Sequence, residues 1–183
     1  MVASSVYVNQ SMHILPNPYA LSIKPRLAYC SYLVDVISDK LKQRYEKTKE
    51  SNANVYSQKD VTKSFQFKKQ VELEFDLLRA SEILRTVKKR LKSITRLSNI
   101  AENVSPLISL IRIIHSSVYS SMPHSHDLIE LSTTLGSIVM DSGCLAEAKF
   151  DFKQTNLESA QILTEVNLIV ESKIRKQYPQ LNF

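Results

Sequence analysis

Glycine is nearly absent from this chain, since only Gly136 and Gly143 occur among its 183 residues. Neither glycine nor proline occurs between Arg26 and Ser105. Because these two residue types form tight turns and end helices, their absence predicts long helices with few reversals. With so few glycines the sequence has no Gly-rich loop that could cradle a phosphate and no Gly-rich elbow around a nucleophilic serine. Nucleotide hydrolysis and serine catalysis are therefore not expected.

Cysteine is equally scarce. Cys30 and Cys144 lie far apart, and neither has a second cysteine or a histidine at the spacing of a metal site. We therefore expect no disulfide framework and no zinc site, which is typical of a reducing cytosol. The N-terminus lacks the charged start and the apolar core of a secretory signal, and no later stretch reaches the ~20 apolar residues of a membrane span. These absences predict a cytoplasmic protein that is soluble or peripheral to a membrane.

Charge is present but unevenly distributed. The formal net charge is +6, yet residues 1–96 hold twice as many basic as acidic residues, and residues 97–183 hold more acidic than basic ones. A basic half joined to a mildly acidic one predicts a surface for anionic partners that the acidic part can cover. Solvated helix faces that carry Lys and Arg for solubility are an equal alternative at this point.

The apolar pattern predicts two long helices. From Leu27 onward apolar residues recur every three or four positions, which predicts a helix over about 26–49. The polar stretch 50–54 favours a turn, and the same apolar spacing then continues from Asp60 to Val104. At ~1.5 Å per residue this second helix would be about 65 Å long. We expect the first helix to pack antiparallel along it, as in a coiled coil, and to leave its distal end exposed.

Three shorter helices are predicted to follow. Ser105 before Pro106 marks a new helix or a kink. Residues 107–114 are apolar nearly all round, so a helix there needs cover on more than one side. A helix over about 127–140 with a glycine cap, and a last amphipathic helix over about 157–177, complete the pattern.

The predicted fold is therefore all-α, with a long antiparallel helical hairpin followed by three shorter helices that pack against it or swing from it. We expect a single helical domain over 26–177, with the hairpin over about 26–105 and the later helices over about 106–177. Residues 1–25 contain three prolines and no helical period, so they are expected to form an N-terminal arm, and residues 178–183 a C-terminal tail. The side chains expected in the core or in assembly contacts are Leu33, Ile37, Phe75, Leu78, Leu91, Ile94, Leu135, Ile138, Leu163 and Val166.

No catalytic constellation and no cofactor site can be recognised. His124 and His126 could supply two metal ligands, but no motif places a third beside them, so a polar turn between helices is the preferred interpretation. Aromatic residues do not alternate with the basic run at 85–96, as a base-stacking platform for single-stranded nucleic acid requires. The sequence predicts a protein that binds and assembles rather than an enzyme.

Two stretches carry a resemblance to a known family. Residues 70–91, QVELEFDLLRASEILRTVKKRL, resemble the second helix of the ESCRT-III superfamily, especially of the archaeal CdvB cell-division proteins. Residues 122–143, MPHSHDLIELSTTLGSIVMDSG, resemble the helix-three to helix-four region of the same family. The resemblance extends over roughly residues 20–175.

The resemblance implies a subunit of a membrane-remodelling filament, which polymerises on anionic membrane in cell division or membrane scission. Its implied partners are further copies of itself, paralogous ESCRT-III-like subunits and the inner face of the cell membrane, including the division site. Many members carry a C-terminal ATPase-binding motif, which this sequence lacks before it ends at Phe183, so contact with an AAA ATPase is expected to be indirect. The basic residues expected at the membrane, chosen by charge, are Lys40, Lys42, Arg44, Lys47, Lys88, Lys89, Arg90, Lys92 and Arg96.

Two questions stay open at this point. The arm could insert into membrane through its apolar residues, or it could be an ordinary disordered or docked terminus. The alternative to the membrane filament, ranked second, is a helical adaptor or a nucleic-acid-binding protein that uses the basic hairpin on the phosphate backbone.

Overall fold

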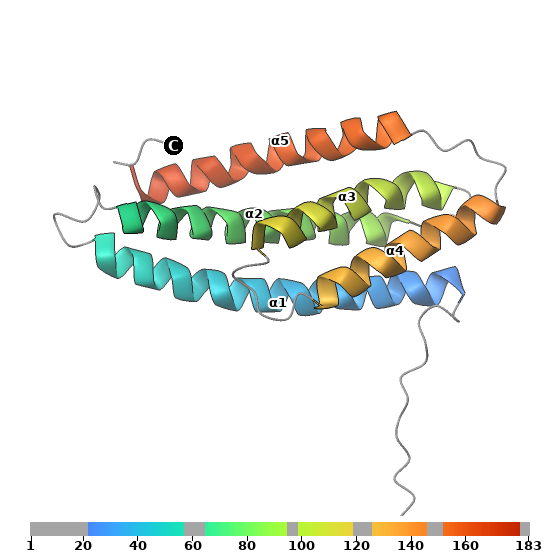
Figure 1. Ribbon diagram of the computed structural model, residues 1–183, viewed down its shortest axis with the longest axis horizontal. Helices are drawn as coiled ribbons and strands as arrows, with labels where there is room; N and C mark the ends of the chain where they lie inside the picture. Colours follow the sequence, from blue (N-terminus) through green and yellow to red (C-terminus); the bar gives the residue numbers. More distant parts are fainter. Residues whose placement is uncertain (1–21, 57–64, 95–98, 119–125, 146–151, 180–183) are drawn as a thin grey trace, which may run out of the picture.

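Five helices make up the part of the chain that the computed structural model describes, namely residues 22–56, 65–94, 99–118, 126–145 and 152–179. These ranges contain no strand, and the helices are α1 (Ile23–Tyr56), α2 (Phe65–Ser93), α3 (Ile100–Val118), α4 (His126–Leu145) and α5 (Phe152–Gln177). The two longest, α1 and α2, lie side by side and antiparallel (Figure 1). The predicted all-α fold, a long hairpin with three shorter helices packed against it, is confirmed.

Helix α1 extends beyond its predicted limits at both ends. It begins at Ile23, before the expected start at residue 26, and Pro25 occupies its first turn, where the missing N–H group costs no helical hydrogen bond. It ends at Tyr56 rather than at residue 49. The prediction of a turn over 50–54 is therefore wrong.

Asn52 explains why the helix continues through this polar stretch. Its side chain is buried, and its amide nitrogen donates hydrogen bonds to the carbonyl oxygen of Gln70, at 3.2 Å, and to Oε2 of Glu74, at 2.8 Å. Both acceptors belong to α2. Contacts between helices thus outweigh the weak helix preference of an isolated asparagine.

Helix α2 is shorter than predicted. It spans Phe65–Ser93, which at ~1.5 Å per residue is about 44 Å, and a separate helix begins at Ile100. The prediction of one continuous helix to Val104, and of a hairpin that reaches residue 105, is therefore wrong. The predicted start of this helix, Asp60, lies outside the described residues.

The sequence just after α2 accounts for the break. The amide of Ile94 donates to the carbonyl oxygen of Leu91 at 3.4 Å, a shortened last turn typical of helix ends. Thr95, Ser98 and Asn99 then follow, and these residue types favour turns and caps over helix interiors. Helix α3 folds back along α2, so the exposed distal end that we expected does not occur (Figure 1).

Helix α3 forms the centre of the core. It contacts α2, α4 and α5, and Leu107, Leu110, Ile111 and Ile114 are fully buried. We expected other helices to pack on more than one side of residues 107–114, and this expectation is confirmed. Pro106 lies inside this helix and does not begin it.

The last two helices are also longer than predicted. Helix α4 begins at His126 and continues to Leu145, so Gly143 lies within it and the predicted glycine cap is wrong. Helix α5 begins at Phe152 rather than near residue 157. Helix α4 packs on α1 and α3, whereas α5 packs on α2 and α3.

Candidate functional site

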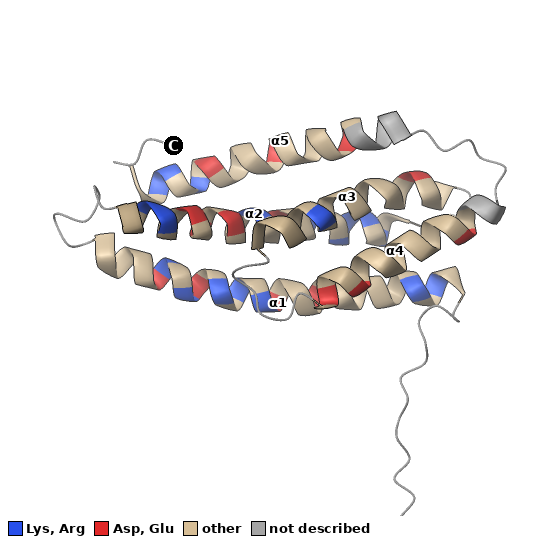
Figure 2. Ribbon diagram, in the orientation of Figure 1, with Lys and Arg blue, Asp and Glu red and all other residues tan. Residues whose placement is uncertain are grey.

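Exposed basic side chains gather on α1 beyond Lys40. Lys42, Arg44 and Lys47 are exposed, and none forms an ion pair with another described residue. Lys40 differs, because its Nζ lies 2.5 Å from Oδ2 of Asp127 in the first turn of α4. The basic stretch thus begins where the cover by α4 ends (Figure 2).

Helical spacing places these residues on two sides of α1. Lys40, Arg44 and Lys47 lie three or four positions apart, so Arg44 and Lys47 lie on the same side of α1 as Lys40, which contacts α4. Lys42 is two positions from Arg44 and therefore points to a different side. Lys42 thus adds to the width of the basic stretch, whereas Arg44 and Lys47 add to its length.

The basic residues at the end of α2 fall into two groups. Lys88 forms an ion pair with Asp35 of α1, and Arg90 forms one with Glu158 of α5. Lys89 and Lys92 are exposed, whereas Arg96 lies outside the described residues. Lys40, Lys88 and Arg90 therefore hold helices together in this conformation, and the membrane role of all nine basic residues stays a prediction.

The apolar residues expected in the core or in assembly contacts are mostly inside the bundle. Seven are buried, namely Leu33, Ile37, Leu78, Leu91, Leu135, Ile138 and Val166. Three are partly buried against the core, namely Phe75, Ile94 and Leu163. A role in contacts between subunits stays a prediction.

Glu82 connects α5 to the hairpin. Its two carboxylate oxygens accept hydrogen bonds from Lys173 Nζ, at 2.6 Å, and from Arg85 Nε, at 2.7 Å. Burial alone would raise the pKa of Glu82, but the hydrogen bond and charge of Lys173, together with Arg85, lower it below its usual value. The ionised carboxylate is therefore the form that stabilises the contact between α2 and α5.

Because this pKa is lowered, part of the free energy of unfolding depends on pH and is lost in acid. A carboxyl group whose pKa is lower in the folded state stabilises above its unfolded pKa, and this contribution disappears as the pH falls through the folded pKa. At pH 7 we expect Glu82→Gln to lower the free energy of unfolding by about 0.5–1 kcal/mol, because half-exposed Lys173 is screened by solvent. The difference from wild type should disappear as the pH falls below about 4 in urea unfolding.

The matched control for this prediction is Glu165→Gln, which changes an exposed glutamate on α5. It should leave the dependence of stability on pH close to that of wild type. A difference between Glu82→Gln and wild type that stays constant from pH 7 to about pH 3 would contradict the assigned ion pair.

A second polar cluster, which sequence reasoning missed, joins three helices at the end of the hairpin. Glu74 is fully buried, and its carboxylate accepts hydrogen bonds from Asn52 of α1 at 2.8 Å, from Gln177 of α5 at 2.9 Å, and from the Tyr178 hydroxyl at 2.8 Å. Burial and the bond to Glu74 raise the pKa of Tyr178. Position 74 lies three residues after buried Val71, at core spacing, which is the signal that the sequence offered.

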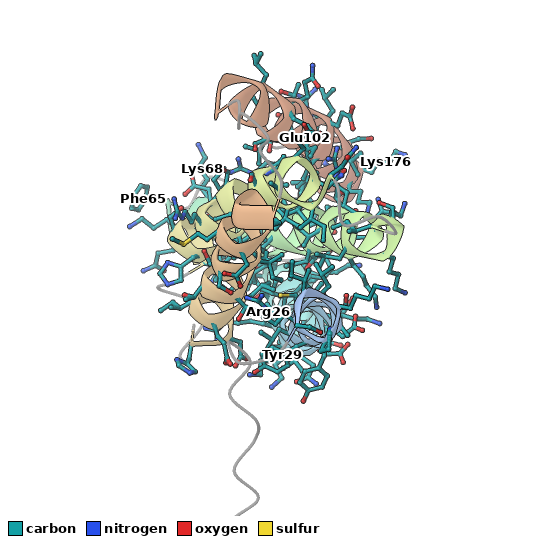
Figure 3. All side chains as sticks on the ribbon, turned by 90° about the vertical axis from the view of Figure 1, so that its right-hand side faces the viewer. Arg26, Tyr29, Phe65, Lys68, Glu102 and Lys176 are labelled. Carbon is teal, nitrogen blue, oxygen red and sulfur yellow. The ribbon has the colours of Figure 1, made fainter. Side chains whose placement is uncertain are left out.

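At the opposite end, α4 is fastened to the start of α1. Arg26, which is 4% exposed, donates to Ser137 Oγ at 3.0 Å and to Asp141 Oδ2 at 2.5 Å. The Tyr29 hydroxyl donates to Glu130 at 2.6 Å, and this bond together with burial raises the pKa of Tyr29 to about 12. Figure 3 looks at the molecule from this end and labels Arg26 and Tyr29 on α1.

Within the described ranges, no three His, Cys, Asp or Glu side chains are grouped so that they could hold a metal ion. His126 is exposed at the start of α4, and His124 lies outside those ranges. None of the described helices combines the length and the apolar character needed to cross a membrane.

Comparisons with known proteins find similarity to a protein named for cell division. Cell division protein B1 of Sulfolobus acidocaldarius is 29% identical to this chain over 106 residues. The alignment covers 57% of this chain and 50% of that protein, so the chain spans about half the length of the relative it matches. No protein-family model and no solved structure matches the chain. The match agrees with the resemblance to archaeal cell-division proteins.

Proposed function

We propose that this chain is a non-catalytic subunit of an ESCRT-III-like filament that polymerises on anionic membrane during cell division. The observation that carries the proposal is the set of exposed basic side chains on the hairpin, namely Lys42, Arg44, Lys47, Lys89 and Lys92. The similarity to a protein named for cell division supports the process. The membrane in question is the inner face of the cell membrane, where anionic lipids attract such residues.

In a polymer, weak contacts between each subunit and the membrane are sufficient to hold the whole filament on the surface. A basic residue near an anionic surface contributes ~1 kcal/mol, so a few exposed residues give one subunit only modest affinity. A filament presents the same residues once per subunit, and each bound subunit raises the effective concentration of its neighbours at the surface. The proposed partners are therefore further copies of this chain and related subunits.

The ion pairs between helices support a second part of this proposal, namely that the helical bundle opens when the chain assembles on membrane. Asp127 of α4 neutralises Lys40, and Glu158 of α5 neutralises Arg90. Detachment of α4 and α5 would break both ion pairs and add Lys40 and Arg90 to the basic side chains that are available to an anionic surface. Assembly on membrane and opening of the bundle would then favour each other.

Vesicle sedimentation tests the proposal. The full chain should sediment with vesicles that contain an anionic phospholipid and not with neutral ones, and the bound fraction should fall as salt rises from about 0.05 to 0.5 M. Electron microscopy of the sedimented vesicles should show filaments. The proposal fails if the protein stays monomeric in solution with anionic vesicles, both alone and with candidate co-subunits. Salt-sensitive binding to duplex DNA without vesicle binding would instead favour a nucleic-acid-binding protein.

A further inference from the structure

The side of α4 that faces away from the bundle carries an exposed, largely apolar stripe. Ile129, Thr133, Gly136 and Met140 follow one another at helical spacing, and we call them the α4 stripe. Ile129 is 50% exposed and Met140 is 74% exposed. A Cβ atom added at Gly136 would meet nothing within 4 Å, so the surface there is open.

A groove adjoins this stripe. It has a volume of about 160 Å³ and is lined by α3 and α4, with Ile111, Leu128 and Ile129 as its apolar residues. Ile129 belongs to both the groove and the α4 stripe. Stripe and groove together form one continuous surface that an extended peptide could cover.

This surface is poor in charge for a structural reason. The acidic residues of α4 are Asp127, Glu130 and Asp141, and all three contact side chains of α1. Helix α4 contains no Lys or Arg, and none of the four residues of the α4 stripe is acidic or basic. Arg112 of α3 is the charged residue at the groove. An occupant of this surface should be apolar and nearly uncharged.

Residues 1–21 have that composition. They lie outside the described residues and contain no Asp, Glu, Lys or Arg. Their apolar side chains include Val6, Val8, Ile14 and Leu15. A segment without Lys or Arg gains no electrostatic attraction to an anionic surface, and contact with an apolar surface stabilises its apolar side chains.

The start of α1, which directly follows this segment in the chain, lies close to one end of the α4 stripe. Arg26, in the first turns of α1, lies 2.5 Å from Asp141, the residue after Met140. From Met140 to Ile129 the helix rises about 17 Å, and 21 extended residues span up to about 70 Å. Pro16 and Pro18 also favour an extended chain in the residues before each of them.

We propose that residues 1–21 of the same chain lie across the α4 stripe and its adjoining groove. The segment thereby covers Ile129 and Met140, which are otherwise exposed. This docking is independent of filament assembly and of membrane binding, so either proposal can fail alone.

Limited proteolysis with chymotrypsin tests the docking. The protease cleaves after aromatic residues and leucine unless proline follows, and residues 1–21 offer Tyr7 and Tyr19. In the double variant Ile129→Lys, Met140→Lys, we expect the initial rate of cleavage within residues 1–21 to rise about tenfold, because a charged stripe no longer holds the segment and the open form is what the protease cuts. Mass spectrometry of the fragments gives the rate at each site.

The matched control changes two comparably exposed apolar residues on α5. The double variant Leu157→Lys, Leu168→Lys alters side chains that are 66% and 63% exposed, and it should leave the cleavage rate unchanged. Equal rates in wild type and both variants overturn the proposal. Protection that disappears on dilution assigns the segment to a second copy, and protection that requires anionic vesicles assigns it to membrane. Either outcome also overturns it.

Discussion

The variant Tyr178→Ala is expected to lose about 3–5 kcal/mol of unfolding free energy, the cost of removing a buried aromatic side chain. Tyr178 is 1% exposed although it follows the last helix. Its ring packs edge-on against Tyr56 of α1, with centroids 5.3 Å apart, and against Phe67 of α2, at 5.9 Å. Its hydroxyl donates to the buried carboxylate of Glu74. The substitution therefore opens a cavity and also removes one donor from a buried charge.

Two further variants separate these contributions in urea unfolding. Tyr178→Phe keeps the ring and removes only the donor to Glu74, so it should cost about 1–3 kcal/mol. Tyr32→Ala removes a tyrosine that is 61% exposed on α1, and it should change stability by less than about 0.5 kcal/mol. Equal losses for Tyr178→Ala and Tyr32→Ala would contradict the docking of the chain after α5 on the hairpin.

The Glu74 cluster also determines how α5 aligns with the hairpin. Asn52, Gln177 and Tyr178 all donate to this one carboxylate, and they come from α1 and from the end of α5 and the residue after it. A shift of α5 by one turn, about 5.4 Å, would leave a buried charge without two of its donors. Apolar packing alone tolerates such shifts better. We infer that Glu74 specifies the register of α5.

Apolar spacing predicted the helical class and much of the core, because a residue every three or four positions must face the same side of a helix. Leu33, Ile37 and Val166 are buried as this spacing requires. The same signal could not locate the break after Ser93, since the apolar residues of α3 continue at a similar spacing. The local signal was the cluster Thr95, Ser98 and Asn99, residue types that favour turns and caps, which the prediction from apolar spacing did not consider.

Polar residues were predicted less well than apolar ones. Asn52 belongs to a stretch predicted as a turn, and Glu74 drew no prediction, yet both are buried and the Asn52 amide donates to the Glu74 carboxylate. The pairs of Lys40 with Asp127 and Arg90 with Glu158 join residues on different helices. Spacing along one helix carries no information on such pairs, since they depend on how helices cross. The uneven distribution of charge along the chain predicted only that the acidic part could cover the basic surface, and not which residues would form pairs.

Reversal of three charges on α1 should weaken binding to anionic vesicles by at least roughly 100-fold, since each basic residue contributes ~1 kcal/mol at such a surface and each new carboxylate is repelled by it. The variant is Lys42→Glu, Arg44→Glu, Lys47→Glu, which changes exposed residues without ion-pair partners in the described part of the chain. The control, Arg112→Glu, Arg175→Glu, Lys176→Glu, alters net charge equally on α3 and α5, away from α1 (Figure 3). It should weaken binding less than about tenfold, because charges beyond a Debye length of the contact are screened. Equal losses in sedimentation would mean that net charge, and not the α1 surface, governs binding.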